Sequence, residues 1–170
     1  MELRQFFLEQ LEIEAASTRK AIERVPEGHN AFKPHERSME FGYLSALVAS
    51  MPGWVAMMID HDETDLNGEG ATFRTRGVTS RAELLRLLDE GLANSRRALR
   101  NTTEEHLMKP WRLKMGEQVL TEGPRYSQIR DGALSHMAHH RGQLTVYLRL
   151  QDIPLPPIYG PTADAAVPGA

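Results

Sequence analysis

The chain has 170 residues, which is enough for one domain with a substantial hydrophobic core. Hydrophobic residues make up 41% and charged residues 25% of it, the proportions of an ordinary globular protein. The formal net charge is -3, which excludes an electrostatic basis for binding nucleic acid or anionic membranes. The chain has no cysteine. Disulfides, thiolate metal ligands and a cysteine nucleophile are therefore excluded, and a reducing compartment is indicated.

The N-terminal residues lack the basic region and the long apolar run of a signal peptide. No stretch approaches the roughly 20 apolar residues that are needed to span a bilayer. We therefore expect a cytoplasmic protein.

Two helices are predicted in the first half of the chain. Apolar residues recur at three- and four-residue steps over residues 3–25, which is the spacing of an amphipathic helix. A second apolar stripe runs over residues 39–60 and is interrupted by Pro52 and Gly53. Because proline lacks a backbone donor and bends helices, this second helix is predicted to be kinked.

Two more helices are predicted in the second half. Ser80 and Glu83 have the spacing of a capping box, so a third helix begins there and fades near residues 101–103. The fourth runs from about Pro124 to Gln151, with the proline well placed near its start.

The connections are less regular. Residues 61–77 are polar and contain two glycines, which predicts a loop, and residues 107–123 suit either a small hairpin or an irregular crossover. The proline-rich tail from Ile153 is predicted to be an extended strap with its last few residues disordered. We therefore predict an all-α four-helix bundle with long connections, forming a single domain over residues 1–170 with an ordered core of about 1–164.

The fourth helix carries three histidines, His136, His139 and His140. On a wheel with roughly 100° per residue, His136 and His140 share the apolar arc and lie one turn apart. His139 lies outside this arc. The wheel therefore predicts that His136 and His140 point into the bundle.

Two imidazoles at positions i and i+4 of a helix can hold one divalent ion, because their ring nitrogens converge over a single turn. The alternative is a pair of buried neutral histidines satisfied by hydrogen bonds. Two imidazoles in an apolar stripe both need partners, and a cation supplies one to each.

A third metal ligand is less evident. His61 follows the second helix and is the candidate, although it also suits a solvated loop. Three other histidines fall in predicted loops: His29, His35 and His106. Two carboxylates were considered as ligands, but each has a role at a helix end that needs no metal: Glu40 and Asp60.

Three segments carry a resemblance to a known family: the string from His136 to Leu144, the segment Met51-Pro52-Gly53-Trp54, and the tail from Ile153 to Asp164. Together with the linker from Lys33 to Met39, they resemble the DinB/YfiT-like superfamily over nearly the whole chain. These are bacterial four-helix-bundle proteins.

This resemblance implies up-down-down-up connectivity and a homodimer. It also implies a nickel or zinc ion held by three histidines, two of which correspond to His136 and His140. Characterised relatives include transferases and isomerases that use a small thiol, so a thiol and a small-molecule substrate are implied partners.

The resemblance places the third histidine of the family at Leu47, which cannot bind a cation. The position lies on the apolar stripe of the second helix, so the ligand is replaced rather than displaced. The predicted pocket residues are Leu47, Met51, Arg141 and Tyr147.

Three functions remain open. The first is a metal-dependent, transferase-like enzyme with His136 and His140 as ligands. The second is a family member without the metal, which binds a small molecule or partner in an apolar pocket at the former site. The third is a dimeric structural or stress-associated bundle.

A DNA-binding role has no support in the charge distribution. Gly68 and Gly70 lack the lysine and helix start of a phosphate-binding loop, and no nucleophile elbow is visible.

Overall fold

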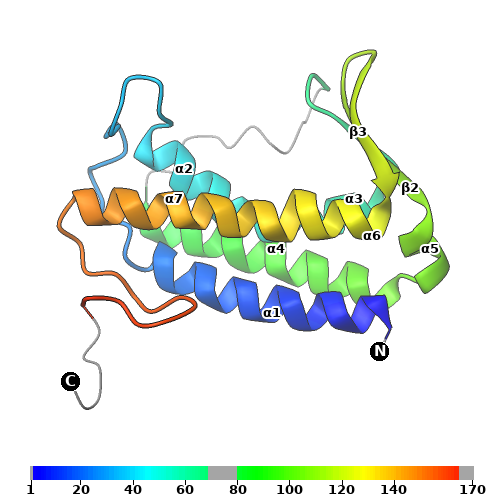
Figure 1. The fold of residues 1–170 in the computed structure, drawn as a ribbon, viewed down its shortest axis with the longest axis horizontal. Coiled ribbons are helices and arrows are strands. Elements are labelled where there is room, and N and C mark those ends of the chain that lie inside the picture. The colour runs from blue at the N-terminus through cyan, green and yellow to red at the C-terminus, as the bar shows by residue number, and fades with distance from the viewer. Residues whose placement is uncertain (1, 69–79, 165–170) are drawn as a thin grey trace.

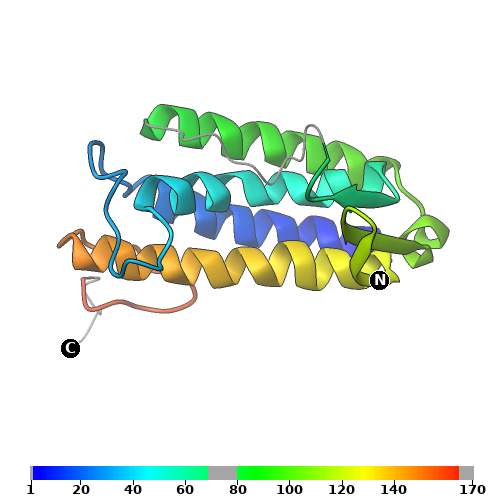
Figure 2. The same cartoon turned by 90° about the horizontal axis from the view of Figure 1, so that it is seen from above.

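Most of the chain lies in long helices that run side by side (Figures 1 and 2). The computed structural model describes residues 2–68 and 80–164. Helix α4 packs against α1 and α2, and α7 packs against the same two helices. The main helical elements are α1 (Leu3–Ile22), α2 (Phe41–Ser50), η1 (Met51–Gly53), α3 (Trp54–Asp60), α4 (Arg81–Asn101), α6 (Arg125–Gln128), η2 (Ile129–Ser135) and α7 (His136–Leu150).

The prediction of a mostly helical protein is confirmed, with one correction. A small sheet in the order β1-β2-β3 caps one end of the helices. Its strands are β1 (Glu63–Asp65), β2 (Pro110–Met115) and β3 (Gln118–Pro124). The hairpin alternative for residues 107–123 is confirmed by the antiparallel β2–β3 pair. The chain is therefore not all-α.

Two short elements were not expected. Strand β1 pairs in parallel with β2, inside the segment predicted as a loop. Helix α5 (Glu104–Met108) leads into the hairpin. Residues 69–77 of the predicted loop lie outside the described residues.

The capping box at the start of α4 is confirmed. The Glu83 backbone N–H donates to the Ser80 side chain, and the Glu83 carboxylate accepts from the Ser80 backbone in return. Two N–H groups that the first helical turn leaves unpaired are satisfied in this way.

The second helical segment is more apolar than we expected from the sequence, in which we found no stretch long enough to span a bilayer. By length and composition Phe41–Asp60 could cross a membrane, yet 78% of its most apolar window is buried inside the structure. Leu44, Val48, Met51 and Val55 are almost completely buried. The apolar length of this segment is therefore accounted for by the hydrophobic core.

The predicted interruption of the second helix at Pro52 is present as a 3-10 turn, η1, between α2 and α3. The Ser95 hydroxyl of α4 is inserted at this point: it donates to the Pro52 carbonyl at 2.6 Å and accepts from the Ala56 backbone N–H at 3.0 Å. In an uninterrupted helix these two backbone groups would pair with each other. The Ser95 side chain therefore replaces the helical hydrogen bond that is missing between α2 and α3.

The same crossing brings two backbones together. A Cβ atom added to Gly91 would lie 2.9 Å from the Gly53 backbone nitrogen, and one added to Gly53 would lie 3.2 Å from the Gly91 Cα. Only residues without a side chain fit at this approach, which places the Ser95 hydroxyl within reach of the helix break.

The proline-rich tail crosses the helices as an extended strap, as predicted. Its apolar residues Ile153, Leu155 and Ile158 pack against the core, and Asp164 forms an ion pair with Arg149.

We expect Ser95→Ala to lower the free energy of unfolding by about 1–3 kcal/mol, because it leaves a buried carbonyl and a buried N–H unpaired. Urea unfolding measures the change. Ser50→Ala is the matched control, since that hydroxyl bonds only a carbonyl of its own helix at a partly exposed position. Equal losses in both variants would contradict this role of Ser95.

Candidate functional site

An unusual helical segment precedes the helix that carries the histidines. Helix α7 is preceded by η2, a π-type segment of seven residues. Such turns use i→i+5 hydrogen bonds, are rare, and often lie at functional sites. Ile129 and Ala133 of this segment are buried, as the wheel predicts for the residues before His136.

The buried stripe of α7 consists of Met137, Arg141, Leu144, Tyr147 and Leu148. His136 and His139 are exposed, and His140 is half-buried. The predicted inward orientation therefore needs correction. His136 and His140 lie at the edge of the buried stripe, beside a cavity, and not within the core.

The structure does bring the two predicted histidines together. Their Nε2 atoms lie 2.9 Å apart, and their ring centroids 4.5 Å apart. His140 Nδ1 lies 2.7 Å from the Gln143 side-chain oxygen. Since that oxygen only accepts, Nδ1 of neutral His140 carries the proton, and its Nε2 presents a lone pair to His136.

Both imidazoles favour the neutral form. Although His136 is exposed overall, partial desolvation of its ring is the main cause that lowers its pKa, and a hydrogen bond donated to the Gly132 backbone partly opposes this. Burial likewise lowers the pKa of His140, opposed by the bond to Gln143, and the neighbouring histidines add repulsion. When neutral His136 donates its one N–H to the Gly132 carbonyl, its Nε2 also presents a lone pair, so the two Nε2 atoms face each other without a proton between them.

His136 forms part of the wall of a cavity of about 260 Å³. The walls come from α2, α3, the β2–β3 hairpin and the helix that carries the histidines. Apolar and aromatic side chains predominate in the lining, which consists of Tyr43, Leu47, Trp54, Met58, Leu66, Trp111, Leu113, Thr121, Gln128, Gly132 and His136. The Trp54 ring meets the His136 ring edge to face, with centroids 5.7 Å apart.

Of the four predicted pocket residues, Leu47 lines this cavity and the others do not. Met51 is fully buried in the core. The Tyr147 hydroxyl donates to the Met39 carbonyl, and its ring packs against Phe32 and Phe41.

Arg141 lies on the α1 side of α7 and is 1% exposed. It donates to the Glu14 carboxylate at 2.6 Å and to the Thr18 hydroxyl at 3.1 Å. It also contacts the Tyr159 hydroxyl of the tail. A buried charge normally has such partners, so Arg141 anchors the strap and does not face a ligand.

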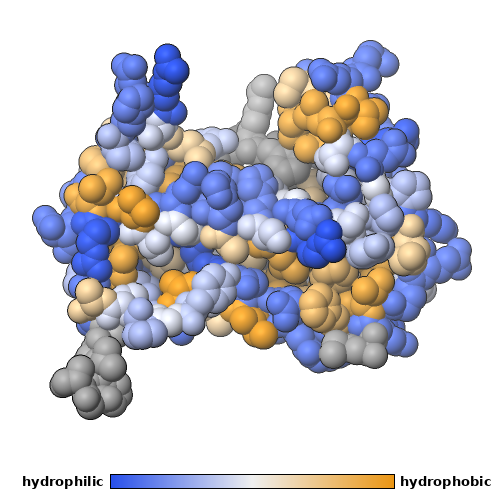
Figure 3. Space-filling view, viewed as in Figure 1, coloured by the Kyte–Doolittle hydropathy of each residue, from blue (hydrophilic) through white to orange (hydrophobic). Residues whose placement is uncertain are grey.

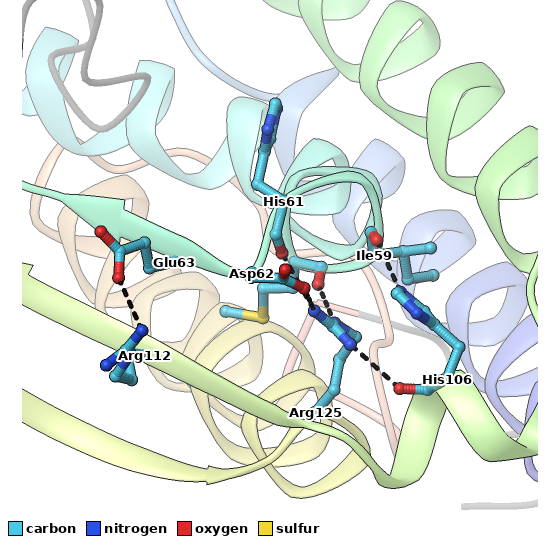
Figure 4. A network of polar contacts seen from close by, with 8 residues as sticks. Ile59, His61, Asp62, Glu63, His106, Arg112 and Arg125 are labelled. Atoms are coloured by element: carbon cyan, nitrogen blue, oxygen red, sulfur yellow. Dashed lines mark hydrogen bonds and ion pairs between the residues drawn. The ribbon is translucent and has the colours of Figure 1, made fainter.

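The candidate third ligand, His61, ends α3 and is exposed. Its ring points away from the network drawn in Figure 4, and its carbonyl accepts from Arg125 at 3.3 Å. No group of three histidine or carboxylate side chains that could hold a metal occurs within residues 2–68 and 80–164.

The other residues considered as ligands have partners elsewhere. His106 Nε2 pairs with the Ile59 carbonyl at 2.9 Å, and Asp60 forms an ion pair with Arg97. His29 contacts Gln151, the His35 ring accepts from the Arg37 backbone, and Glu40 lies 3.5 Å from Lys33.

A buried arginine that the sequence did not reveal bonds to the backbone of a residue in the cavity wall. Arg125 is fully buried and donates to the Met58 carbonyl at 2.6 Å, the His106 carbonyl at 2.9 Å and the Asp62 carboxylate at 2.5 Å (Figure 4). These bonds join α3, α5 and α6. Met58, whose carbonyl is held here, lines the cavity with its side chain.

No protein-family model matches this chain, and a search of curated proteins gives no match. Solved structures do match. A DinB-like protein of Bacillus subtilis, YjoA, is 20% identical, with a TM-score of 0.67 over 92% of this chain and 99% of that one. A DinB-like protein of Bacillus cereus ATCC 10987 is 18% identical, with a TM-score of 0.67 over 90% and 95%.

The chain has the fold of the DinB-like proteins. The resemblance to DinB-like proteins expected from the sequence is thereby confirmed. Within this DinB-like fold, two imidazoles of the implied metal set are adjacent, and Leu47 lies in the wall of the cavity beside them.

We expect stability to fall with acidification below pH 6.5. Because the pKa of both histidines is lowered from 6.5 in the folded chain, the unfolded chain takes up protons first as the pH drops. Stability from this pair is complete above pH 6.5 and declines towards the lower folded pKa. Urea unfolding between pH 7.5 and 5 measures the decline, and His140→Gln should reduce it. A slope unchanged in that variant would contradict the assignment.

Proposed function

We propose that this DinB-like chain is a small-molecule-binding protein whose ligand occupies the cavity beside His136. In this proposal the helical body is a four-helix bundle, and the hairpin closes one side of the binding site. The observation that carries the proposal is a cavity of about 260 Å³ with a predominantly apolar lining and an imidazole in its wall. Ligand pockets commonly combine such a lining with a few polar groups.

The three-histidine metal set implied by the resemblance does not fit these residues. Leu47 offers no donor, and the described residues contain no group of three ligands. We therefore assign no reaction step to a metal, and a thiol-dependent transferase remains without a residue basis in the described structure.

One observation favours a second candidate, a two-histidine metal site. The Nε2 atoms of His136 and His140 are 2.9 Å apart. Two nitrogens bound tetrahedrally to one zinc ion at about 2.0–2.1 Å lie roughly 3.3 Å apart. A small rotation of the rings would bring them to this separation, with solvent completing the coordination.

The cavity is tested by filling it. Leu113 is half-buried in the cavity wall, so Leu113→Trp should abolish ligand binding. Val119→Trp is the matched control, because Val119 lies on the same hairpin, is 45% exposed and does not line the cavity. Ligand-observed NMR with a fragment set of both charged and uncharged molecules supplies the readout.

Fragments bound by the wild type and by Val119→Trp, but lost in Leu113→Trp, would support the proposal. Absence of binding to the wild type, or binding that Leu113→Trp leaves intact, would overturn it.

Metal binding is tested by restoring the missing donor. We expect Leu47→His to gain affinity for nickel or zinc, because it adds a third imidazole to the cavity wall that His136 shares. A metal at 100 times its Kd would stabilise the folded variant by about 2.7 kcal/mol. Thermal unfolding with and without the metal measures this gain, and Leu47→Asn is the control without a ligand.

The wild-type chain should show no comparable shift. Stoichiometric metal binding by the wild type that is lost in His136→Ala would replace the proposal with the two-histidine metal site.

A further inference from the structure

Among residues 2–68 and 80–164, no charged side chain lines the cavity beside His136. The polar members of the lining are an imidazole, a threonine hydroxyl, a glutamine amide and three aromatic N–H or O–H groups. Burying an ionised group without a counter-charge is strongly unfavourable. The part of a ligand that enters this cavity must therefore be uncharged.

The charges nearby are committed to other partners. Arg125 is engaged by backbone carbonyls and Asp62, and Arg141 pairs with Glu14 on the opposite side of α7. Neither of these residues lines the cavity. No described group is thus placed to neutralise an ionised ligand inside it.

The volume limits the ligand to a small molecule. A cavity of about 150 Å³ accommodates a benzene molecule, and this one measures about 260 Å³. By proportion it has room for about ten non-hydrogen atoms. This corresponds to one six-membered ring with short substituents.

The walls favour an aromatic ring. Trp54 and Trp111 contribute from α3 and β2, and Tyr43 contributes from α2. Aromatic side chains add edge-to-face and offset-stacked contacts to the area that a ring buries.

One side of the cavity is polar. The Thr121 hydroxyl donates to the Gln128 side-chain oxygen at 3.3 Å, which leaves the threonine oxygen as an acceptor and the glutamine NH₂ group as a donor. Together with the His136 ring, these groups can pair with one neutral hydroxyl or amide.

On the basis of the proposed function, we infer that the ligand is an uncharged monocyclic aromatic molecule carrying one neutral hydrogen-bonding group. The ring lies between the tryptophans, and the polar group faces Thr121 and Gln128. The hydrophobic residues Met115, Val119 and Leu120 are exposed on the hairpin, over which Figure 3 shows a hydrophobic patch. An apolar surface thus lies close to the cavity on the same hairpin.

The test uses three probes of the same size and shape: 4-methylbenzyl alcohol, 4-methylbenzylammonium and 4-ethyltoluene. The first has a neutral hydroxyl, the second a charge in its place, and the third a methyl group. The chain contains two tryptophans, and both line the cavity, so their intrinsic fluorescence reports binding. Calorimetry gives the affinities.

We expect the alcohol to bind at least tenfold more tightly than the ammonium probe and several-fold more tightly than the hydrocarbon. Thr121→Val should remove the preference for the alcohol over the hydrocarbon while the hydrocarbon still binds. Thr145→Val is the control, because that hydroxyl bonds a carbonyl of its own helix and does not line the cavity.

Equal or tighter binding of the ammonium probe would overturn this inference and leave the proposed binding site intact. The fragment screen could find ligands that Leu113→Trp removes while none of the three probes binds. That result would overturn the inferred ligand class and leave the proposed function standing. Failure of that screen as well would overturn the proposed function.

Discussion

The arrangement of the site depends on one interaction, the insertion of the Ser95 hydroxyl between the Pro52 carbonyl and the Ala56 N–H. Proline at this position already removes one helical hydrogen bond, and the serine supplies partners for the two groups that the break exposes. The close approach of Gly53 and Gly91 allows α4 to come near enough for this contact. Trp54 and Met58, which α3 carries, form one wall of the cavity.

Two buried arginines then fix the helix that bears the histidines. Arg125 ties the start of α6 to the end of α3 and to α5, and Arg141 ties α7 to α1 and to the tail. Each guanidinium is buried with hydrogen-bond partners on several elements, so removing a partner would leave an uncompensated charge at a cost of about 3–5 kcal/mol. Between the two arginines lie η2 and His136. The position of the imidazole pair is thus set from both ends of the helix.

Local patterns predicted much of this structure. The capping box at Ser80, the interruption of the second helix at Pro52 and the i, i+4 proximity of His136 and His140 follow from short-range spacing, and the structure contains all three. Each depends on groups within a few residues of one another, so tertiary contacts had little opportunity to override them.

Contacts between distant segments were not predictable in the same way. The roles of Ser95 and Arg125 depend on groups on other elements, and sequence spacing carries no signal for them. Arg141 was predicted to line the pocket, whereas Glu14 and Thr18 of α1 provide it with buried partners on the other side of α7. The π-type turn η2 was missed because its residues have no pattern that distinguishes them from an ordinary helix. Strand β1 has three residues, too few for an alternating pattern.

Leu47 connects the two questions that the site raises, which are what it binds and whether it needs a metal. The same side chain that withholds a third donor also adds apolar surface to the cavity wall. A histidine there would introduce a polar group that requires a partner, whereas leucine requires none. The two imidazoles lie against each other, with His140 bonded to Gln143 and His136 to the Gly132 backbone. Both favour the neutral form because desolvation lowers their pKa. Leucine at position 47 therefore has two consequences: it makes the cavity suited to a neutral, apolar ligand, and it leaves the site without the third donor of a three-histidine metal centre.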